Sequence, residues 1–225
     1  LSGCQYVSSP KIKALIELES IHEIGVQQNI NYELLVDESP NFVMGYGIDE
    51  SSNNYLNKLK SLGIKVVLNA EYMEAHPLGK AEWIKFIAAF YNEGDRADSL
   101  FEVIEKNYIN LLAQTKTIKQ KPTVFVGMPW NGAWYVPGGK SFQAQLFKDA
   151  GAEYLWMNNE EKSSLIKSKE VIIDVAFEAD FWLNQNSYQS ITDIIEFDPK
   201  FKKLNAIKKQ NIYNNDQRIN AFSGN

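Results

Sequence analysis

Aromatic side chains follow two predicted strands of this chain, where they could stack on a flat ligand. Tyr46 comes after one apolar run, and Trp130 and Trp134 come after another further along the sequence. The faces of such rings suit a large, planar and partly apolar molecule, which a few polar groups then orient. Arg218 follows the last predicted strand and could pair with a carboxylate or phosphate of that molecule. Together these residues are the candidate ligand contacts.

Some of these residues also have a purely structural interpretation. Trp134 stands beside Tyr135 and Val136, and this stretch could equally form a buried strand. Arg218 could equally be a lone surface arginine. Tyr46 and Trp130 follow glycine or proline at strand ends, where side chains meet solvent or ligand. That position favours a binding role for Tyr46 and Trp130.

The groups on which most enzymes depend are scarce in the sequence. It has 2 histidines and 1 cysteine, whereas a transition-metal site needs three or four ligands. Gly45-Tyr46-Gly47 has no third glycine at the spacing of a dinucleotide-binding turn. The sequence also contains neither a phosphate-binding P-loop nor a G-x-S-x-G nucleophile turn. We therefore expect no catalytic residue, no bound metal and no cofactor, and favour a binding protein over an enzyme.

Composition narrows the possible partners. With 225 residues, 44% of them hydrophobic, the chain can bury a sizeable core and fits one large or two small domains. The formal net charge of −5 gives no electrostatic reason to bind nucleic acid. The longest apolar stretch, near residues 86–91, is far too short to span a bilayer.

A unit that occurs twice positions the aromatic residues. Each copy has an apolar strand, an aromatic loop, a helix and a short closing strand, over residues 42–68 and 123–156. Continuous apolar strands suit a parallel sheet covered on both faces, and ligands bind beyond the carboxyl ends of such strands. A long helix is predicted between the copies at residues 96–116. In the second copy, Ser141 is the expected N-cap of a helix at residues 142–149.

Several short motifs resemble those of class III periplasmic substrate-binding proteins, the iron-siderophore, haem and cobalamin group of ABC importers. They cover nearly the whole chain and include Leu62-Gly63-Ile64-Lys65-Val66-Val67, Gly94-Asp95-Arg96-Ala97, Trp134-Tyr135-Val136-Pro137-Gly138-Gly139, Asp149-Ala150-Gly151-Ala152 and Ala179-Asp180-Phe181-Trp182. In this order and spacing the motifs are fairly specific. The resemblance implies an α/β fold of two lobes with mainly parallel sheets, joined by a long rigid helix.

The resemblance also implies a division of the chain. The N-terminal lobe would occupy residues 1–79, the helical connector residues 80–118 and the C-terminal lobe residues 119–225. Members of this group have further sheet elements before residue 1 and a helical segment after residue 225. We therefore expect the N-terminal lobe to be incomplete and a C-terminal helix to be missing.

The function implied by the resemblance is transport. The protein would capture an iron-siderophore, haem or cobalamin-type metal chelate between its lobes and deliver it to an ABC permease. Docking would use one acidic residue on each lobe: Glu170 on the second, and Glu50 on the first, with Asp49 as its rival. A carboxylate that favours the dipole at a helix start would explain both positions as well. We expect a monomer in the periplasm or cell envelope that binds no nucleic acid.

Alternatives from other classes stay open. An α/β two-lobe enzyme of chelatase or reductase type would need more histidines or cysteines than the sequence offers. A surface adhesion module would use the same aromatic residues. The start, Leu1-Ser2-Gly3-Cys4, looks like the end of a bacterial lipoprotein signal, but no apolar segment precedes it. We therefore favour the interpretation that this likeness to a lipoprotein signal is a coincidence, and a lipid anchor stays an open alternative.

Overall fold

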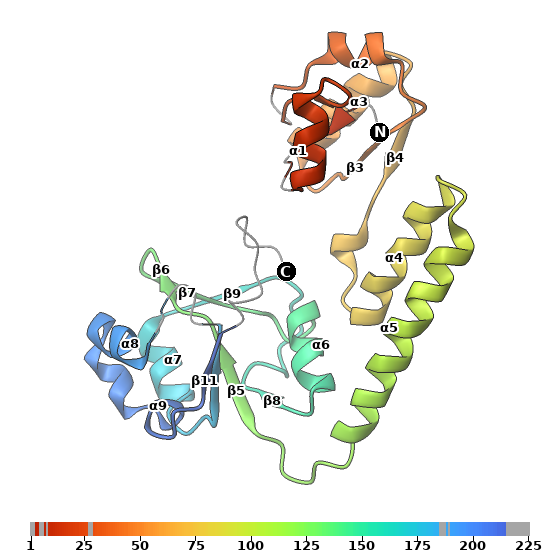
Figure 1. Ribbon diagram of the computed structural model, residues 1–225. Helices are drawn as coiled ribbons and strands as arrows, with labels where there is room; N and C mark the ends of the chain where they lie inside the picture. The colour runs from red at the N-terminus through yellow and green to blue at the C-terminus, as the bar shows by residue number, and fades with distance from the viewer. Residues whose placement is uncertain are drawn as a thin grey trace. The chain divides into compact units, whose positions relative to one another are not determined.

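The computed structural model describes residues 3–4, 7, 9–26, 29–184, 188 and 190–214. Within them, the chain forms one unit up to Glu71 and a second unit from Tyr72 onward (Figure 1). Arg218 lies outside the described residues. Most strand pairs in both units are parallel, which confirms the predicted α/β fold with mainly parallel sheets.

In the first unit, pairs of parallel strands pack with helices. The strands are β1 (Gly3–Cys4), β2 (His22–Glu23), β3 (Val43–Gly45) and β4 (Val66–Leu68), paired as β1–β2 and β3–β4. The helices are α1 (Pro10–Glu17), α2 (Tyr32–Glu38) and α3 (Glu50–Ser61). Leu35 of α2 is buried against Leu56 and Leu59 of α3, and these residues form the centre of the core.

Helix α3 begins at Glu50 because Asp49 caps it. The N–H of Ser52 donates to Asp49 Oδ1 at 2.7 Å, and the N–H of Asp49 donates to Ser52 Oγ at 3.0 Å. This reciprocal capping box satisfies N–H groups that have no partner within the helix. The same hydrogen bonds from Ser52 hold the pKa of the Asp49 carboxyl below its usual value. Tyr55, Leu56 and Leu59 then recur at helical spacing on the buried side.

The second unit contains a parallel sheet and a small antiparallel sheet. The parallel sheet has the order β11 (Ile212–Tyr213), β10 (Phe181–Leu183), β5 (Thr123–Val126) and β8 (Glu153–Tyr154). The antiparallel sheet has the order β6 (Pro129–Trp130), β7 (Ala133–Val136) and β9 (Leu165–Lys167). The helical segments are η1 (Glu71–Met73), α4 (Pro77–Ala89), α5 (Gly94–Thr115), α6 (Phe142–Asp149), α7 (Lys169–Val175), α8 (Ile191–Phe197), η2 (Pro199–Lys203) and α9 (Asn205–Lys208).

Helices cover both faces of the parallel sheet, as its continuous apolar strands predict. Helix α6 lies on one side of this sheet and α7–α9 lie on the other (Figure 1). Along β5, Val124 and Val126 pack with residues of α6, whereas Phe125 packs with residues of α7–α9. Helix α6 has the predicted bounds, and the N–H of Ala144 donates to the Oγ of its N-cap Ser141 at 3.2 Å.

A hairpin joins β6 to β7 where the sequence predicted an aromatic loop. Its turn residues, Asn131 and Gly132, have φ values of 49° and 80°. Positive φ at both central residues matches the mirror-image turn that Asn-Gly favours, because this turn follows the twist of the flanking strands. The Asn-Gly pair therefore predicts a β-hairpin at this position, and the interpretation as an aromatic loop did not take it into account.

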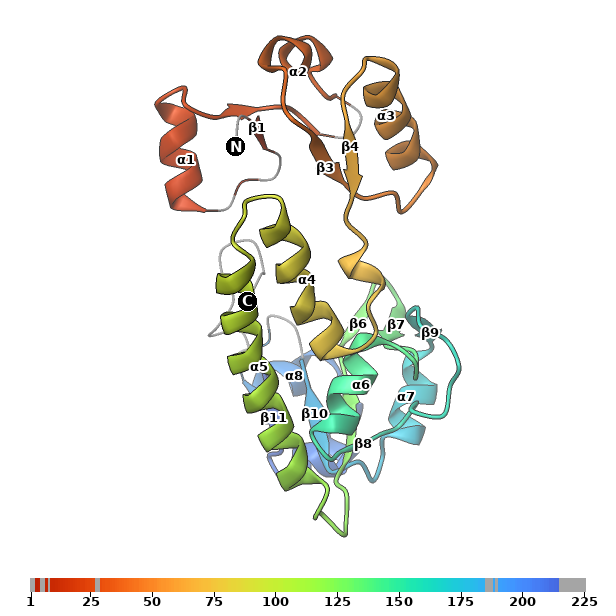
Figure 2. The same cartoon turned by 90° about the vertical axis from the view of Figure 1, so that its right-hand side faces the viewer.

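The long helix predicted at residues 96–116 is α5, which packs along α4 (Figure 2). Its C-terminal half is attached to α6 through Asp149. The Tyr108 hydroxyl donates to Asp149 Oδ2 at 2.5 Å, and Thr115 Oγ1 donates to the carbonyl oxygen of Asp149 at 2.7 Å. Burial and this hydrogen bond to a carboxylate raise the pKa of Tyr108. Within the second unit, hydrogen bonds thus attach the long helix to α6, and it also packs against α4.

We expect Tyr108→Phe to lower the free energy of unfolding by about 1.5 kcal/mol, because it removes a hydrogen bond to a charged, partly buried acceptor. Urea unfolding followed by circular dichroism measures the change. Tyr91→Phe is the control, since Tyr91 is 58% exposed in the turn after α4. Equal stabilities for the two variants would show that the Tyr108–Asp149 bond contributes nothing.

Candidate functional site

The antiparallel sheet presents aromatic and aliphatic side chains on its outer side. Trp130 pairs with Ala133, and Tyr135 pairs with Ile166, so all four side chains share one side of the sheet. Trp130 is 63% exposed, Tyr135 43% and Ile166 67%. The Trp130 and Tyr135 ring centroids lie 6.3 Å apart at an interplanar angle of 56°. We call Trp130, Tyr135 and Ile166 the aromatic face.

Trp134 points the other way and corrects one predicted ligand contact. Its side chain is fully buried, and its Nε1–H donates to the carbonyl oxygen of Val126 at 2.9 Å. Its ring centroid lies 5.8 Å from that of Trp182. The buried-strand interpretation is therefore right for Trp134 and Val136, whereas Tyr135 is exposed and takes the place of Trp134 as a candidate contact. The alternation of β7 is the signal that separates them.

Tyr46 lies just beyond the carboxyl end of β3 in the first unit. Its side chain is 37% exposed, as expected for a residue at the end of a parallel strand where ligands bind. Trp130 belongs to the second unit, so joint contact of Tyr46 and Trp130 with one ligand stays a prediction.

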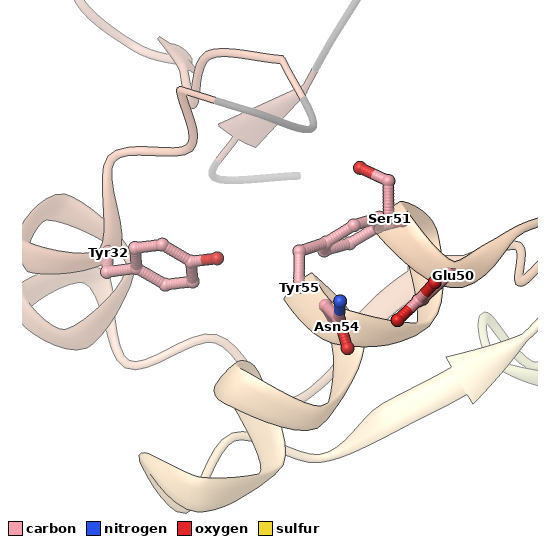
Figure 3. A pocket seen from close by; sticks show the side chains of 5 residues that line it. All are labelled: Tyr32, Glu50, Ser51, Asn54 and Tyr55. Atoms are coloured by element: carbon pink, nitrogen blue, oxygen red, sulfur yellow. The ribbon is translucent and has the colours of Figure 1, made fainter.

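Glu50 lines a polar hollow of about 450 Å³ in the first unit. The other lining residues are Tyr32, Ser51, Asn54 and Tyr55. Figure 3 shows the Tyr32 hydroxyl pointing from α2 toward the side chains at the start of α3. The rival residue Asp49 accepts its hydrogen bonds from Ser52 and serves as the cap of α3. Of the two carboxylates, Glu50 is the one that faces this hollow.

Glu170 is exposed in the first turn of α7. The N-cap of α7 is Ser168, whose Oγ accepts from the N–H of Val171 at 3.3 Å. Next to Glu170, Lys169 Nζ lies 2.5 Å from Asp198 Oδ2. Glu50 and Glu170 thus both occupy first turns, where a carboxylate is favourable whether or not it also contacts a partner.

Both histidines have local structural partners. His22 Nε2 lies 3.1 Å from Glu38 Oε1. His76 is the N-cap of α4, and its Nδ1 accepts from the N–H of Leu78 at 3.2 Å. Among the described residues, no cluster of three or more histidine, cysteine, aspartate or glutamate side chains could hold a metal ion. In the same part of the chain, none of the helices combines the length and apolarity needed to cross a bilayer.

Comparison with known proteins identifies the fold and the family. The family model described as periplasmic binding protein matches residues 7–219. An uncharacterized lipoprotein of Methanocaldococcus jannaschii is 30% identical over 205 residues, which cover 89% of this chain and 48% of the relative. The chain thus spans about half the length of the curated relatives it matches.

Solved structures share the fold at low sequence identity. A possible iron-binding, periplasmic solute-binding protein from Staphylococcus epidermidis has a TM-score of 0.71 at 20% identity, covering 95% of this chain and 80% of that one. A periplasmic haem-binding protein of Vibrio cholerae has a TM-score of 0.67 at 18% identity, covering 88% and 76% respectively. With the match over residues 7–219, the chain belongs to the periplasmic binding proteins, a family of binding proteins rather than enzymes.

Proposed function

We propose that this chain is the ligand-capturing part of an ABC importer's substrate-binding protein, and that its ligand is a metal chelate of the iron-siderophore, haem or cobalamin type. The observation that carries the proposal is the aromatic face. Trp130 and Tyr135 are exposed on a sheet whose other side is fixed in the core by Trp134 and Val136. Large exposed rings on a fixed scaffold bind flat, partly apolar ligands with little loss of side-chain freedom.

Other contacts complete the proposed site. Tyr46 would stack on the ligand from the first unit, and Arg218, outside the described residues, would pair with an acidic group. The names of the structural neighbours, an iron-binding and a haem-binding protein, support a metal chelate. Docking on the permease would use Glu50 and Glu170.

The proposed location is the periplasm or cell envelope. Membership of the periplasmic binding proteins supports it, and so does the relative named a lipoprotein. A lipid anchor would hold the protein near the permease.

A titration tests the proposed function. The purified protein is mixed with haemin, cobalamin and a ferric siderophore while its tryptophan fluorescence is recorded. We expect saturable quenching by at least one chelate, because Trp130 is exposed on the aromatic face. A folded protein that responds to none of them would contradict the proposal.

We expect Trp130→Ala to weaken chelate binding about tenfold, which corresponds to about 1.4 kcal/mol of lost stacking and apolar contact. Isothermal titration calorimetry measures the affinity without relying on the deleted fluorophore. Tyr91→Ala is the matched control, because Tyr91 is an exposed aromatic residue in the turn after α4. If both variants bind as the unmodified protein does, the aromatic face is not the ligand site.

A further inference from the structure

A second hollow, of about 290 Å³, lies within the second unit and is lined by residues of the segment before α4 and of the start of α6. Its walls include the side chains of Tyr72, Met73 and Phe142. Two lysines, Lys140 and Lys162, also line it. We call this cavity the lysine hollow.

A pair of glycines makes the lysine hollow possible. The N–H of Gly138 donates to the carbonyl oxygen of Ser163 at 3.1 Å, and the N–H of Lys140 donates to that of Glu161 at 2.9 Å. A Cβ on Gly138 would overlap the carbonyl oxygen of Glu161, and a Cβ on Gly139 would overlap backbone oxygens of the same loop. Only glycine permits this close approach of two backbones. The approach places Lys162 at the cavity that Lys140 also lines.

The charged residues that line the lysine hollow are two lysines and one glutamate. Glu74 also lines it, but its Oε1 accepts from the Trp83 Nε1–H at 3.2 Å. Lys140 Nζ lies 3.6 Å from Glu160 Oε1, and both side chains are more than half exposed. Such a surface pair is weak and easily exchanged for another anion. A third cation, Lys80, lies over the Phe142 ring at 5.2 Å from its centroid.

We propose that the lysine hollow binds an anionic group of the ligand, such as a carboxylate or catecholate, through Lys140 and Lys162. The inference rests on the proposed function and narrows it, because it selects acidic chelates over neutral ones. Ammonium groups form charge-assisted hydrogen bonds with such oxygens, and a cavity whose walls carry more cations than anions attracts anions. Apolar walls from Tyr72, Met73 and Phe142 would contact the adjoining part of the chelate.

Pairs of probes in which one member is anionic and the other lacks the acidic groups test the inference. Haemin carries two carboxylates, whereas haem dimethyl ester carries none, and both are titrated in the same detergent solution. A ferric tris-catecholate and a neutral ferric hydroxamate form a second pair. We expect the protein to bind the anionic member of a pair about tenfold more tightly, with a preference that falls as salt is added.

The variant Lys140→Ala/Lys162→Ala should lose this preference, because its affinity for the anionic probe falls toward its affinity for the neutral one. Lys140→Arg/Lys162→Arg, which keeps both charges, should retain most of it. The control Lys106→Ala/Lys119→Ala removes the same charge from exposed positions elsewhere in the second unit and should leave the preference intact.

Three results would overturn the inference. Equal binding of both members of each pair would do so, as would a preference that survives in Lys140→Ala/Lys162→Ala or disappears in the control variant. In these cases chelate binding itself would stand. If none of the four probes binds the folded protein, the inference fails, and if cobalamin does not bind either, the proposed function fails with it.

Discussion

Replacing Trp134 by alanine is expected to lower the free energy of unfolding by about 4 kcal/mol and to leave the chelate affinity of the folded protein unchanged. The indole is fully buried. Its ring centroid lies 5.8 Å from that of Trp182 and 6.0 Å from that of Phe201, so its removal leaves a cavity between large neighbours. The carbonyl oxygen of Val126 also loses the indole N–H that donates to it. Urea unfolding measures the first effect and calorimetric titration the second.

Trp130→Ala is the counterpart of this experiment, because the two tryptophans lie on neighbouring strands and face opposite ways. We expect it to change the stability by less than about 1 kcal/mol, as is usual for an exposed position. The two variants should therefore separate stability from binding. The reverse pattern, a stable Trp134→Ala protein that no longer binds, would show that Trp134 is a ligand contact after all.

Local sequence signals were enough for most of the secondary structure. The continuous apolar run at residues 123–127 gave the central strand β5, and Ser141 gave the start of α6. Each of these features depends on neighbours a few residues apart, so the chain itself carries the information.

The orientation of β7 required the tertiary structure. Ala133 and Tyr135 share one side of the strand, and Trp134 and Val136 share the other. Alternation separates the two sets, but either set contains an aromatic ring and a small or branched residue. Packing against Trp182 places Trp134 in the core. No residue close to β7 in the sequence predicts that contact.

The lysine hollow was also beyond reach of the sequence. Lys140 and Lys162 come together because the backbone near residue 138 contacts that near residue 161. Gly138 and Gly139 permit this contact between two segments that are distant in the sequence. A single sequence does not reveal candidate sites that are formed by segments distant from one another in the chain.

The ion pair between Lys169 and Asp198 should produce the other large effect on stability. Asp198 is 7% exposed, and its Oδ2 lies 2.5 Å from Lys169 Nζ. Its Oδ1 accepts from the N–H of Lys200 at 2.9 Å, so the same carboxylate begins η2. We expect Asp198→Ala to lower the free energy of unfolding by about 3 kcal/mol, because it leaves the Lys169 ammonium without its partner in a partly buried position.

The dependence of this effect on pH distinguishes the charge from the packing. The hydrogen bond from Lys169 holds the pKa of the Asp198 carboxyl below its usual value. A depressed pKa in the folded state means that the stabilisation is present above the unfolded pKa of about 3.9 and is lost as the pH falls through the folded value. The stability difference between the unmodified protein and Asp198→Ala should therefore be constant from about pH 5 to 8 and shrink below about pH 4. Urea unfolding at stepped pH measures it.

Asp198→Asn is the matched control, because asparagine retains an oxygen for the Lys200 N–H but carries no charge. We expect it to lose part of the stability at neutral pH, and to approach the unmodified protein as the solution becomes acidic. A loss for Asp198→Ala that is the same at pH 3 and pH 7 would assign the whole effect to packing and capping.

Because Lys169 precedes Glu170 in the first turn of α7, the same variants also test whether this pair holds the proposed docking carboxylate in place. If it does, permease affinity should fall in Asp198→Ala even under conditions where the protein remains fully folded.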